Sequence, residues 1–383
     1  MTVTTIGARA DGSAIAGPPP AADVSALILD LQAQGLRLET QVERRTGGAG
    51  PTDSGMLWVE GFQITAPVMP SSPYVLESED EGYGIYRDGV RLATAAAERR
   101  PRFYDRQTAD GIPYWQIALL HLDSLASTVV QHCTYWGNDD QCQFCGIGVS
   151  LDSGRTIARK TPEQLAEVAI AARDLDGAVD ATLTTGSTRG VDRGALYVAR
   201  CGQAVKEAAG LPVEVQFEPP YDLDVIDEVG AMGIDSVGIH VETFDPAVLA
   251  RVAPGKARTG IESYFAAWER AVAVFGEGQV STYVILGMGE DPELTIEGCK
   301  RAVDMGVYPF VVPLRPVAGS LMADWKPPTS AYTTPIYRRV LAYMTERGTM
   351  NSTTAKAGCA RCQACSGMSS MEPVLQIGRR PGA

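Results

Sequence analysis

The fold of this chain is decided by the stretch Cys133-Thr-Tyr-Trp-Gly-Asn-Asp-Asp-Gln-Cys142-Gln-Phe-Cys145-Gly-Ile-Gly148. Eight residues separate its first two cysteines, and two residues separate the last two. A cuboidal [4Fe-4S] cluster takes four ligands and its irons prefer thiolates, so three local cysteines would leave one iron open for chemistry. Taken alone, the stretch is equally compatible with a zinc site or with buried thiols beside a turn.

Composition narrows the classes of function. The chain has 383 residues, of which 45% are hydrophobic, so a complete core is expected. Lysine and arginine total 33 against 46 acidic residues, a net charge of -13, and this excess of acid argues against a nucleic-acid partner. Neither an apolar run of about 18 residues nor a signal pattern is evident, so we expect a cytoplasmic protein without a membrane span. Eight cysteines in a reducing compartment favour metal ligation or core packing over disulfides.

The chain divides into four segments by composition. Residues 1–55 are expected to hold a leader rich in Gly, Ala and Pro, a helix over 22–37 and a polar linker. Residues 56–125 predict a small β-rich N-terminal domain, in which Asp88-Gly89 and Asp110-Gly111 close tight hairpins. Residues 126–348 predict a barrel, and residues 349–383 a cysteine-bearing C-terminal tail.

Strand and helix patterns alternate across the barrel segment. Six such units with apolar strands predict parallel β-structure with right-handed crossovers, curved into a partial (β/α)6 barrel of the α/β class. Helix entry is marked by Thr161-Pro162, Asp245-Pro246 and Asp291-Pro292, each a capping side chain followed by proline. The expected strands are 126–131, 180–186, 213–218, 236–242, 280–286 and 309–314; the expected helices are 161–175, 192–209, 222–232, 260–274, 292–305 and 331–347.

Two motifs together resemble the radical SAM (S-adenosylmethionine) superfamily. One is the cysteine stretch with Phe144 before its last cysteine; the other is Ile285-Leu-Gly287-Met-Gly-Glu290 after the fifth expected strand. The usual cysteine spacing there is three and two, and Gly precedes the Ile motif where this chain has Tyr283. The core resembles biotin and lipoyl synthases, and the whole chain resembles a bacterial radical SAM family encoded beside nitrilases. The resemblance implies an open six-unit barrel with its site at the C-terminal strand ends.

The resemblance also implies a cofactor site. A [4Fe-4S] cluster would be held by Cys133, Cys142 and Cys145, with SAM on its open iron. Ordinary structural roles stay open for several SAM-site residues: a turn for Ser187, a strand-end acid for Glu218 and a core histidine for His240. Among three bases near the SAM carboxylate, arginine suits a carboxylate better than Lys256 does. The expected SAM-binding residues are Phe144, Gly146, Thr185, Gly186, Ser187, Glu218, His240, Glu242, Arg251, Arg258, Ile285, Gly287 and Glu290.

The tail carries a second group of cysteines, Cys359, Cys362 and Cys365, spaced two and two. Three thiols so close together favour metal ligation, and an auxiliary iron-sulfur cluster and zinc both stay open. By resemblance, Arg315 is a clamp for a substrate anion or a bridge to this second site, with a purely structural role as the alternative. Cys201 and Cys299 lie in expected helices and are interpreted as core thiols.

These features predict an enzyme that cleaves SAM reductively to a 5'-deoxyadenosyl radical, which abstracts hydrogen from a small molecule. A flavodoxin or ferredoxin would supply the electron. Two alternatives stay open. Sulfur insertion of the lipoyl or biotin synthase type would need an auxiliary cluster on the tail, and a zinc-stabilised barrel could bind a ligand without turnover.

Overall fold

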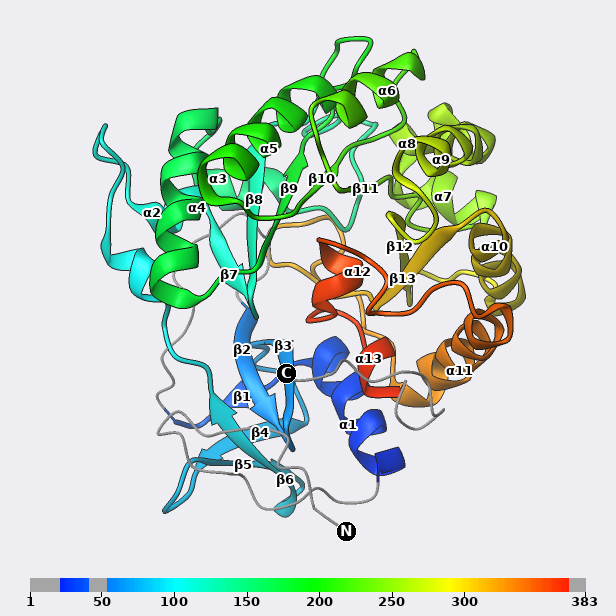
Figure 1. Cartoon of the computed structure of the whole chain (residues 1–383). Helices are drawn as coiled ribbons and strands as arrows, with labels where there is room; N and C mark the ends of the chain where they lie inside the picture. The colour runs from blue at the N-terminus through cyan, green and yellow to red at the C-terminus, as the bar shows by residue number, and fades with distance from the viewer. Residues whose placement is uncertain (1–20, 41–53, 372–383) are drawn as a thin grey trace.

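The computed structural model describes residues 21–40 and 54–371 and contains two sheets, with helices wrapped around the larger one (Figure 1). Residues 1–20 of the expected leader (1–21) and most of the expected linker lie outside the described residues. The expected N-terminal helix is present as α1 (Ala21–Gln34).

The larger sheet has seven strands in the order β13-β12-β11-β10-β9-β8-β7. Strands β8 to β13 run parallel, so the predicted six-unit partial barrel is confirmed. Strand β7 pairs antiparallel with β8, although it precedes the boundary expected at residue 126. The strands are β7 (Leu119–His121), β8 (Ser124–Val130), β9 (Asp180–Thr185), β10 (Val213–Gln216), β11 (Ser236–Gly238), β12 (Val280–Leu286) and β13 (Val307–Pro313).

Strand β11 is shorter than the expected 236–242. The N–H of Val241 donates to Thr282 Oγ1 at 3.0 Å, so the backbone ladder is interrupted there. Pairing resumes at Glu242, which has a φ of 69° and an isolated bridge to Val284. The strand therefore ends early because a side chain replaces one backbone partner, while the chain keeps its direction into the site.

Helices pack around the outside of this sheet (Figure 1). The predicted caps are confirmed: Thr161 forms a full capping box with Gln164, and Asp245 and Asp291 each accept two backbone N–H groups. No described helix is long and apolar enough to cross a membrane. The helices are α3 (Ile147–Asp152), α4 (Pro162–Asp176), α5 (Ala195–Ala209), α6 (Asp224–Ala231), α7 (Pro246–Val252), α8 (Pro254–Thr259), α9 (Ile261–Phe275), α10 (Pro292–Asp304) and α11 (Ser330–Arg347); α3, α7 and α8 were not predicted.

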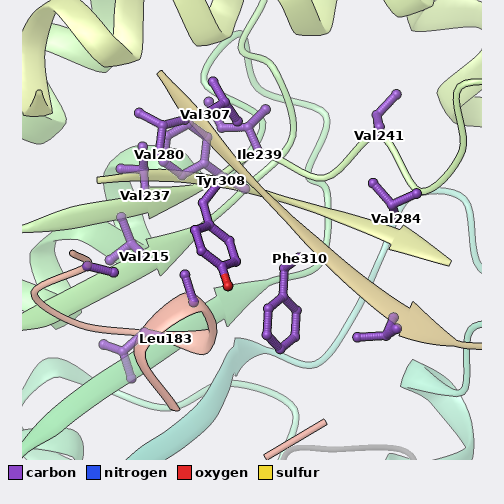
Figure 2. Close-up of a cluster of buried hydrophobic side chains, with 14 of the residues drawn as sticks. Leu183, Val215, Val237, Ile239, Val241, Val280, Val284, Val307, Tyr308 and Phe310 are labelled. Carbon is purple, nitrogen blue, oxygen red and sulfur yellow. The ribbon is translucent and has the colours of Figure 1, made fainter. Parts of the chain in front are cut away.

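The barrel core consists of side chains from neighbouring strands, and Figure 2 shows part of it. Most of the residues shown there are β-branched, as expected for buried parallel strands. Tyr308 and Phe310 lie two residues apart on β13 and so share a face. The predicted core thiols Cys201 and Cys299 are fully buried on α5 and α10. The labelled core residues are Leu183, Val215, Val237, Ile239, Val241, Val280, Val284, Val307, Tyr308 and Phe310.

The smaller sheet has six strands in the order β1-β4-β5-β6-β2-β3. The Asp88-Gly89 turn joins β5 to β6 with positive φ at both residues, as predicted. The Asp110-Gly111 turn closes only an isolated bridge, because residues around it form short helices instead of strands. The elements here are β1 (Arg37–Leu38), β2 (Ser54–Val59), β3 (Phe62–Pro67), β4 (Tyr74–Ser78), β5 (Tyr83–Arg87), β6 (Val90–Ala97), η1 (Arg102–Asp105) and α2 (Tyr114–Ile117).

The tail packs into the barrel instead of trailing from it. It forms two short helices that the sequence did not predict, α12 (Cys359–Cys362) and α13 (Met368–Met371). In Figure 1, α12 lies within the ring of barrel elements. The N–H of Gly358 donates to Asp180 Oδ2 at 3.0 Å, and Asp180 is the first residue of β9. The tail therefore covers the N-terminal ends of the strands.

Candidate active site

The loop between β8 and α3 brings the first three cysteines to one cavity. Cys133, Cys142 and Cys145 all line a cavity of about 300 Å³ at the C-terminal ends of the strands. The loop is fixed against α7, because the N–H of Gln143 donates to the carbonyl of Val252 at 2.7 Å. The three thiols thus meet at the barrel end where the sequence placed them.

The eight-residue spacer packs on the barrel rim. Tyr135 donates a hydrogen bond to Glu218 at 3.2 Å, and Asp140 forms an ion pair with Arg258. The ring of Tyr135 also lies against Gly255 on α8, where a Cβ would be only 2.8 Å from it. The long first gap is therefore an ordered strap across the rim.

Burial makes Cys142 and Cys145 poor thiolates on their own. It raises the pKa of Cys145 to about 11 and the pKa of Cys142 further, so a metal would have to displace their protons. Over residues 21–40 and 54–371, no three Cys, His, Asp or Glu side chains are already grouped as metal ligands. The donor set nevertheless suits iron-sulfur chemistry, because three soft thiols share one cavity.

The wall beside the thiols is charged. Lys256 Nζ lies 2.6 Å from Glu242 Oε1 and 2.8 Å from the carbonyl of His240, and all three residues line the cavity. Burial is the largest single influence and would lower the pKa of Lys256, but the charge of Glu242, the charges of Tyr264 and Cys142 and the hydrogen bond to Glu242 together raise that pKa well above its usual value. The lysine is therefore a fixed ammonium inside the site.

His240 presents a nitrogen to this cavity. Its Nδ1 accepts the N–H of Tyr283 at 3.2 Å, and burial lowers its pKa well below the usual value, so the neutral ring carries its hydrogen on Nε2. That Nε2 is buried and has no partner among the described residues. The Oε1 of Gln131, another residue of the cavity wall, is likewise unpaired within the described chain. Unpaired buried polar atoms are costly, so this cavity fits a polar ligand.

Glu218 is held by a second cation. Its carboxylate forms an ion pair with Arg193, which is 1% exposed and also donates to the carbonyl of Pro219 at 3.2 Å. Lys256 Nζ lies 4.0 Å from its other oxygen. Glu218 lines the cavity as predicted, but as part of a neutral network of two acids and two bases.

Neither of the two arginines expected to bind SAM is in the cavity wall. Arg251 donates to the carbonyl of Met288 at 2.6 Å, and Arg258 pairs with Asp140 outside the cavity. Lys256 takes the inner position, because the chain breaks direction at Ala253 between α7 and α8 and turns that face inward. Of the three bases, only Lys256 lines this cavity, and which of them binds the SAM carboxylate stays a prediction.

The motif after β12 forms a braced turn. Glu290 accepts the N–H groups of Gly287 and Met288 at 2.7 and 2.8 Å. Gly287 has a φ of 99°, and a Cβ there would lie 2.8 Å from Pro328. Neither Gly287 nor Glu290 lines the cavity of the loop cysteines, and Ile285 lines the neighbouring one instead.

The remaining expected residues do line the first cavity: Phe144, Gly146, Thr185, Gly186 and Ser187. At Gly186 the close approach is real, since a Cβ would lie 2.1 Å from the carbonyl oxygen of His132. Sequence reasoning missed part of the wall, although inward alternation along β8, β9 and β10 could have indicated Thr128, Thr184 and Gln216. The missed residues are Thr128, Gln131, Tyr135, Ile147, Thr184, Gln216, Phe217 and, as a preferred ligand, Lys256.

A second cavity, of about 340 Å³, continues from the first toward the tail. The two share Thr128, Phe144, Thr184 and Gln216. Cys359, Cys362 and Cys365 line the second cavity, whose other wall residues are mainly apolar or neutral. The loop cysteines and the tail cysteines therefore line two adjoining cavities.

Arg315 lies at the edge of this second cavity and joins three segments. It donates to the carbonyl of Gln32 at 2.7 Å, to Thr65 Oγ1 at 2.8 Å and to the carbonyl of Cys365 at 3.0 Å. These bonds fit the bridging role better than a free anion clamp, since Nε and both terminal nitrogens are engaged.

Comparison with known proteins identifies a domain in the central part of the chain. Residues 134–306 match the radical SAM superfamily. The chain contains a radical SAM domain. This membership implies an iron-sulfur enzyme that uses SAM, while the nitrilase-associated subfamily stays a prediction.

One curated relative and several solved structures are similar to the radical SAM chain. Bacteriochlorophyllide c C-7(1)-hydroxylase from Chlorobaculum limnaeum is 31% identical over 122 residues, which cover 31% of this chain and only 30% of that enzyme. Methylornithine synthase is 18% identical with a TM-score of 0.45, covering 58% of this chain and 62% of the synthase. A radical SAM methyltransferase from Sphaerobacter thermophilus is 16% identical with a TM-score of 0.46, covering 78% and 82%.

Proposed function

We propose that this protein binds SAM in the first cavity and cleaves it reductively, and that the resulting 5'-deoxyadenosyl radical abstracts hydrogen from a small molecule in the second. The observation that carries this proposal is that the two cavities adjoin and share the wall residues Thr128, Phe144, Thr184 and Gln216. A reactive group generated at the loop cysteines would face the second cavity directly. The radical SAM domain supports the chemistry.

The residues of the first cavity would orient SAM. Cys133, Cys142 and Cys145 would hold a [4Fe-4S] cluster, which supplies an open iron for SAM and one electron to it. Lys256 offers a buried ammonium to the SAM carboxylate, and His240 Nε2–H offers a donor to the nucleoside. The mainly apolar wall of the second cavity would limit access of water, which protects a carbon radical from side reactions.

The protein would need an external reductant and a reducing compartment. We propose a flavodoxin or a ferredoxin as the electron donor, and a cytoplasmic location, where thiols stay reduced. The excess of acidic residues supports the absence of nucleic acid among the partners.

Anaerobic reconstitution with iron and sulfide, followed by dithionite and SAM, tests the proposal. We expect 5'-deoxyadenosine and methionine in the reaction mixture, detected by liquid chromatography. Stoichiometric zinc without 5'-deoxyadenosine would overturn the proposal and favour a zinc-stabilised binding protein. Reduced flavodoxin and reduced ferredoxin, each replacing dithionite, would then identify the donor.

A second candidate function is sulfur insertion of the lipoyl or biotin synthase type. It is favoured by the position of the tail cysteines, because three thiols line the cavity in which the substrate would lie. An auxiliary iron-sulfur cluster on Cys359, Cys362 and Cys365 could supply the sulfur. Iron counting separates the cases: about eight irons per chain fit two cuboidal clusters and about four fit one.

A further inference from the structure

The three tail sulfurs do not have equivalent surroundings. Cys359 Sγ accepts two hydrogen bonds, from the Tyr283 hydroxyl at 3.1 Å and from Gln216 Nε2 at 3.4 Å. Cys362 Sγ instead lies 3.5 Å from the carbonyl of His121, which can only accept. Cys365 Sγ accepts one hydrogen bond, from Thr65 Oγ1 at 3.5 Å, and Thr65 belongs to the smaller sheet. Among the described residues, Cys359 is therefore the tail sulfur that accepts hydrogen bonds from barrel side chains.

Both donors to Cys359 are themselves held in place. Gln216 Nε2 also donates to Glu214 Oε2 at 2.7 Å, which orients its amide. The ring of Tyr283 packs edge-on against His240 at 4.6 Å and against Phe310 at 5.0 Å between centroids. Neither donor depends on a flexible surface side chain.

The backbone of Cys359 is fixed from the other side. Its N–H donates to Glu214 Oε2 at 3.2 Å. Arg361, two residues on, forms ion pairs with Asp123 and with the fully buried Asp180. At Gly358 a Cβ would lie 2.1 Å from the Glu214 carboxylate, so only glycine fits. The position of the sulfur is thus set by strands β9 and β10.

Tyr283 is the side chain that joins the two cavities at this point. It lines the second cavity and contacts His240, which lines the first. Tyr283 also occupies the position at which the resembled motif has glycine. This chain therefore has a large hydrogen-bond donor side chain where the motif has no side chain. The one polar side-chain atom of Tyr283 is directed at Cys359.

We propose that Tyr283 is a positioning residue for a redox-active iron centre on the tail cysteines: its hydroxyl holds Cys359 Sγ at the substrate cavity and raises the reduction potential of that centre. This inference rests on the second site described under the proposed function. A hydrogen bond to a metal-bound thiolate draws negative charge from the sulfur, which favours the reduced state.

The test isolates the tail centre. A chain with Cys133→Ala, Cys142→Ala and Cys145→Ala keeps the tail cysteines and the two core thiols Cys201 and Cys299, so the tail holds its only remaining group of three cysteines. The iron content and midpoint potential of this tail-only chain are measured after anaerobic reconstitution. Adding Tyr283→Phe should disfavour the reduced state about tenfold, which is about 59 mV for a one-electron couple. Tyr308→Phe is the matched control, because Tyr308 is a buried barrel tyrosine whose hydroxyl accepts from Gln363 in the tail at 3.1 Å.

Each outcome decides. A lowered potential, or loss of iron with Tyr283→Phe alone, supports the proposal. An unchanged potential, or the same change with Tyr308→Phe, overturns it. Zinc without iron in the tail-only chain also overturns it but leaves SAM cleavage untouched, since cleavage is measured separately on the chain with intact loop cysteines.

Discussion

Two groups of three cysteines occupy opposite ends of the same barrel. The loop cysteines lie at the C-terminal strand ends beside the charged network of Lys256 and Glu242. The tail cysteines lie near the strand starts, where the cavity wall is mainly apolar or neutral and the sulfurs meet Tyr283, Gln216 and backbone.

The difference suggests a division of labour between the two ends. A charged wall suits a zwitterionic ligand such as SAM, whose carboxylate and ammonium need fixed partners. A neutral wall suits a carbon skeleton that must approach a radical. Substitutions at one end of the barrel test whether the other end keeps its properties.

The largest effect is expected from Cys142→Ala. Without this ligand the loop cannot complete three-thiolate ligation, so 5'-deoxyadenosine formation should fall below detection, and iron should drop by about four per chain. Cys299→Ala, which removes a buried thiol on α10, is the control and should keep both. Retained SAM cleavage in Cys142→Ala would refute the ligand assignment and with it the distinction between the two ends.

Arg361→Met tests whether buried charges hold the tail at the N-terminal ends of the strands. It leaves Asp180 buried without its cation, so the free energy of unfolding should fall by about 3 kcal/mol in urea denaturation. Cys359, Cys362 and Cys365 should also be alkylated faster by iodoacetamide, as followed by mass spectrometry. Arg347→Met, at an exposed ion pair with Asp304, should change stability by less than about 1 kcal/mol. Equal effects of the two changes would show that the tail is not locked.

Lys256→Met tests the proposed contact of Lys256 with the SAM carboxylate at the C-terminal strand ends. Loss of a charge-assisted contact to the SAM carboxylate should raise the Kd for SAM about 10- to 100-fold. Arg258→Met removes a base that is exposed and pairs with Asp140, and it should change the Kd about twofold at most. Isothermal titration calorimetry on the reconstituted protein measures both. If Arg258→Met weakens SAM binding as much as Lys256→Met does, the proposed role of Lys256 is wrong.

The smallest effect concerns Lys160, which is fully buried under the upper loop and donates to the carbonyl of Thr128 at 2.7 Å. Burial lowers the pKa of Lys160 from 10.5 to about 7, so the unfolded chain binds more protons between these values. Stability should therefore rise with pH across this window, by about 1.4 kcal/mol per unit from this group. Lys160→Met should flatten the rise, as measured by urea denaturation at about pH 7.5 and about pH 8.5. An unchanged slope would show that Lys160 stays charged when buried.

Much of the barrel could be predicted from sequence because its signals are local. Strand β12 was predicted at its observed bounds, since an apolar run meets Gly at one end and a polar segment at the other. Helix α4 was predicted within one residue at each end, because Thr161-Pro162 and Gln164 carry a complete capping box. The loop cysteines followed from their place after the first parallel strand.

The rest depends on contacts distant in sequence. The choice of Lys256 over Arg251 and Arg258 required the break between α7 and α8, which periodicity does not reveal. The tail was expected to lie beyond the last helix, yet buried acids at the starts of β9 and β10 draw it into the barrel. Asp180 and Glu214 are acidic residues in otherwise apolar strands. Their presence was the one feature of the sequence that could have indicated a buried partner such as the tail.

The shared wall of the two cavities has a kinetic consequence. A small molecule that entered past Cys133 and Cys145 would reach the second cavity through the space that SAM would fill. On that route the two substrates would bind in a compulsory order. The small molecule would bind first, and SAM would bind second and close the entrance behind it. Excess SAM would slow the reaction by occupying the entrance early, so initial rates would pass through a maximum as SAM concentration rises.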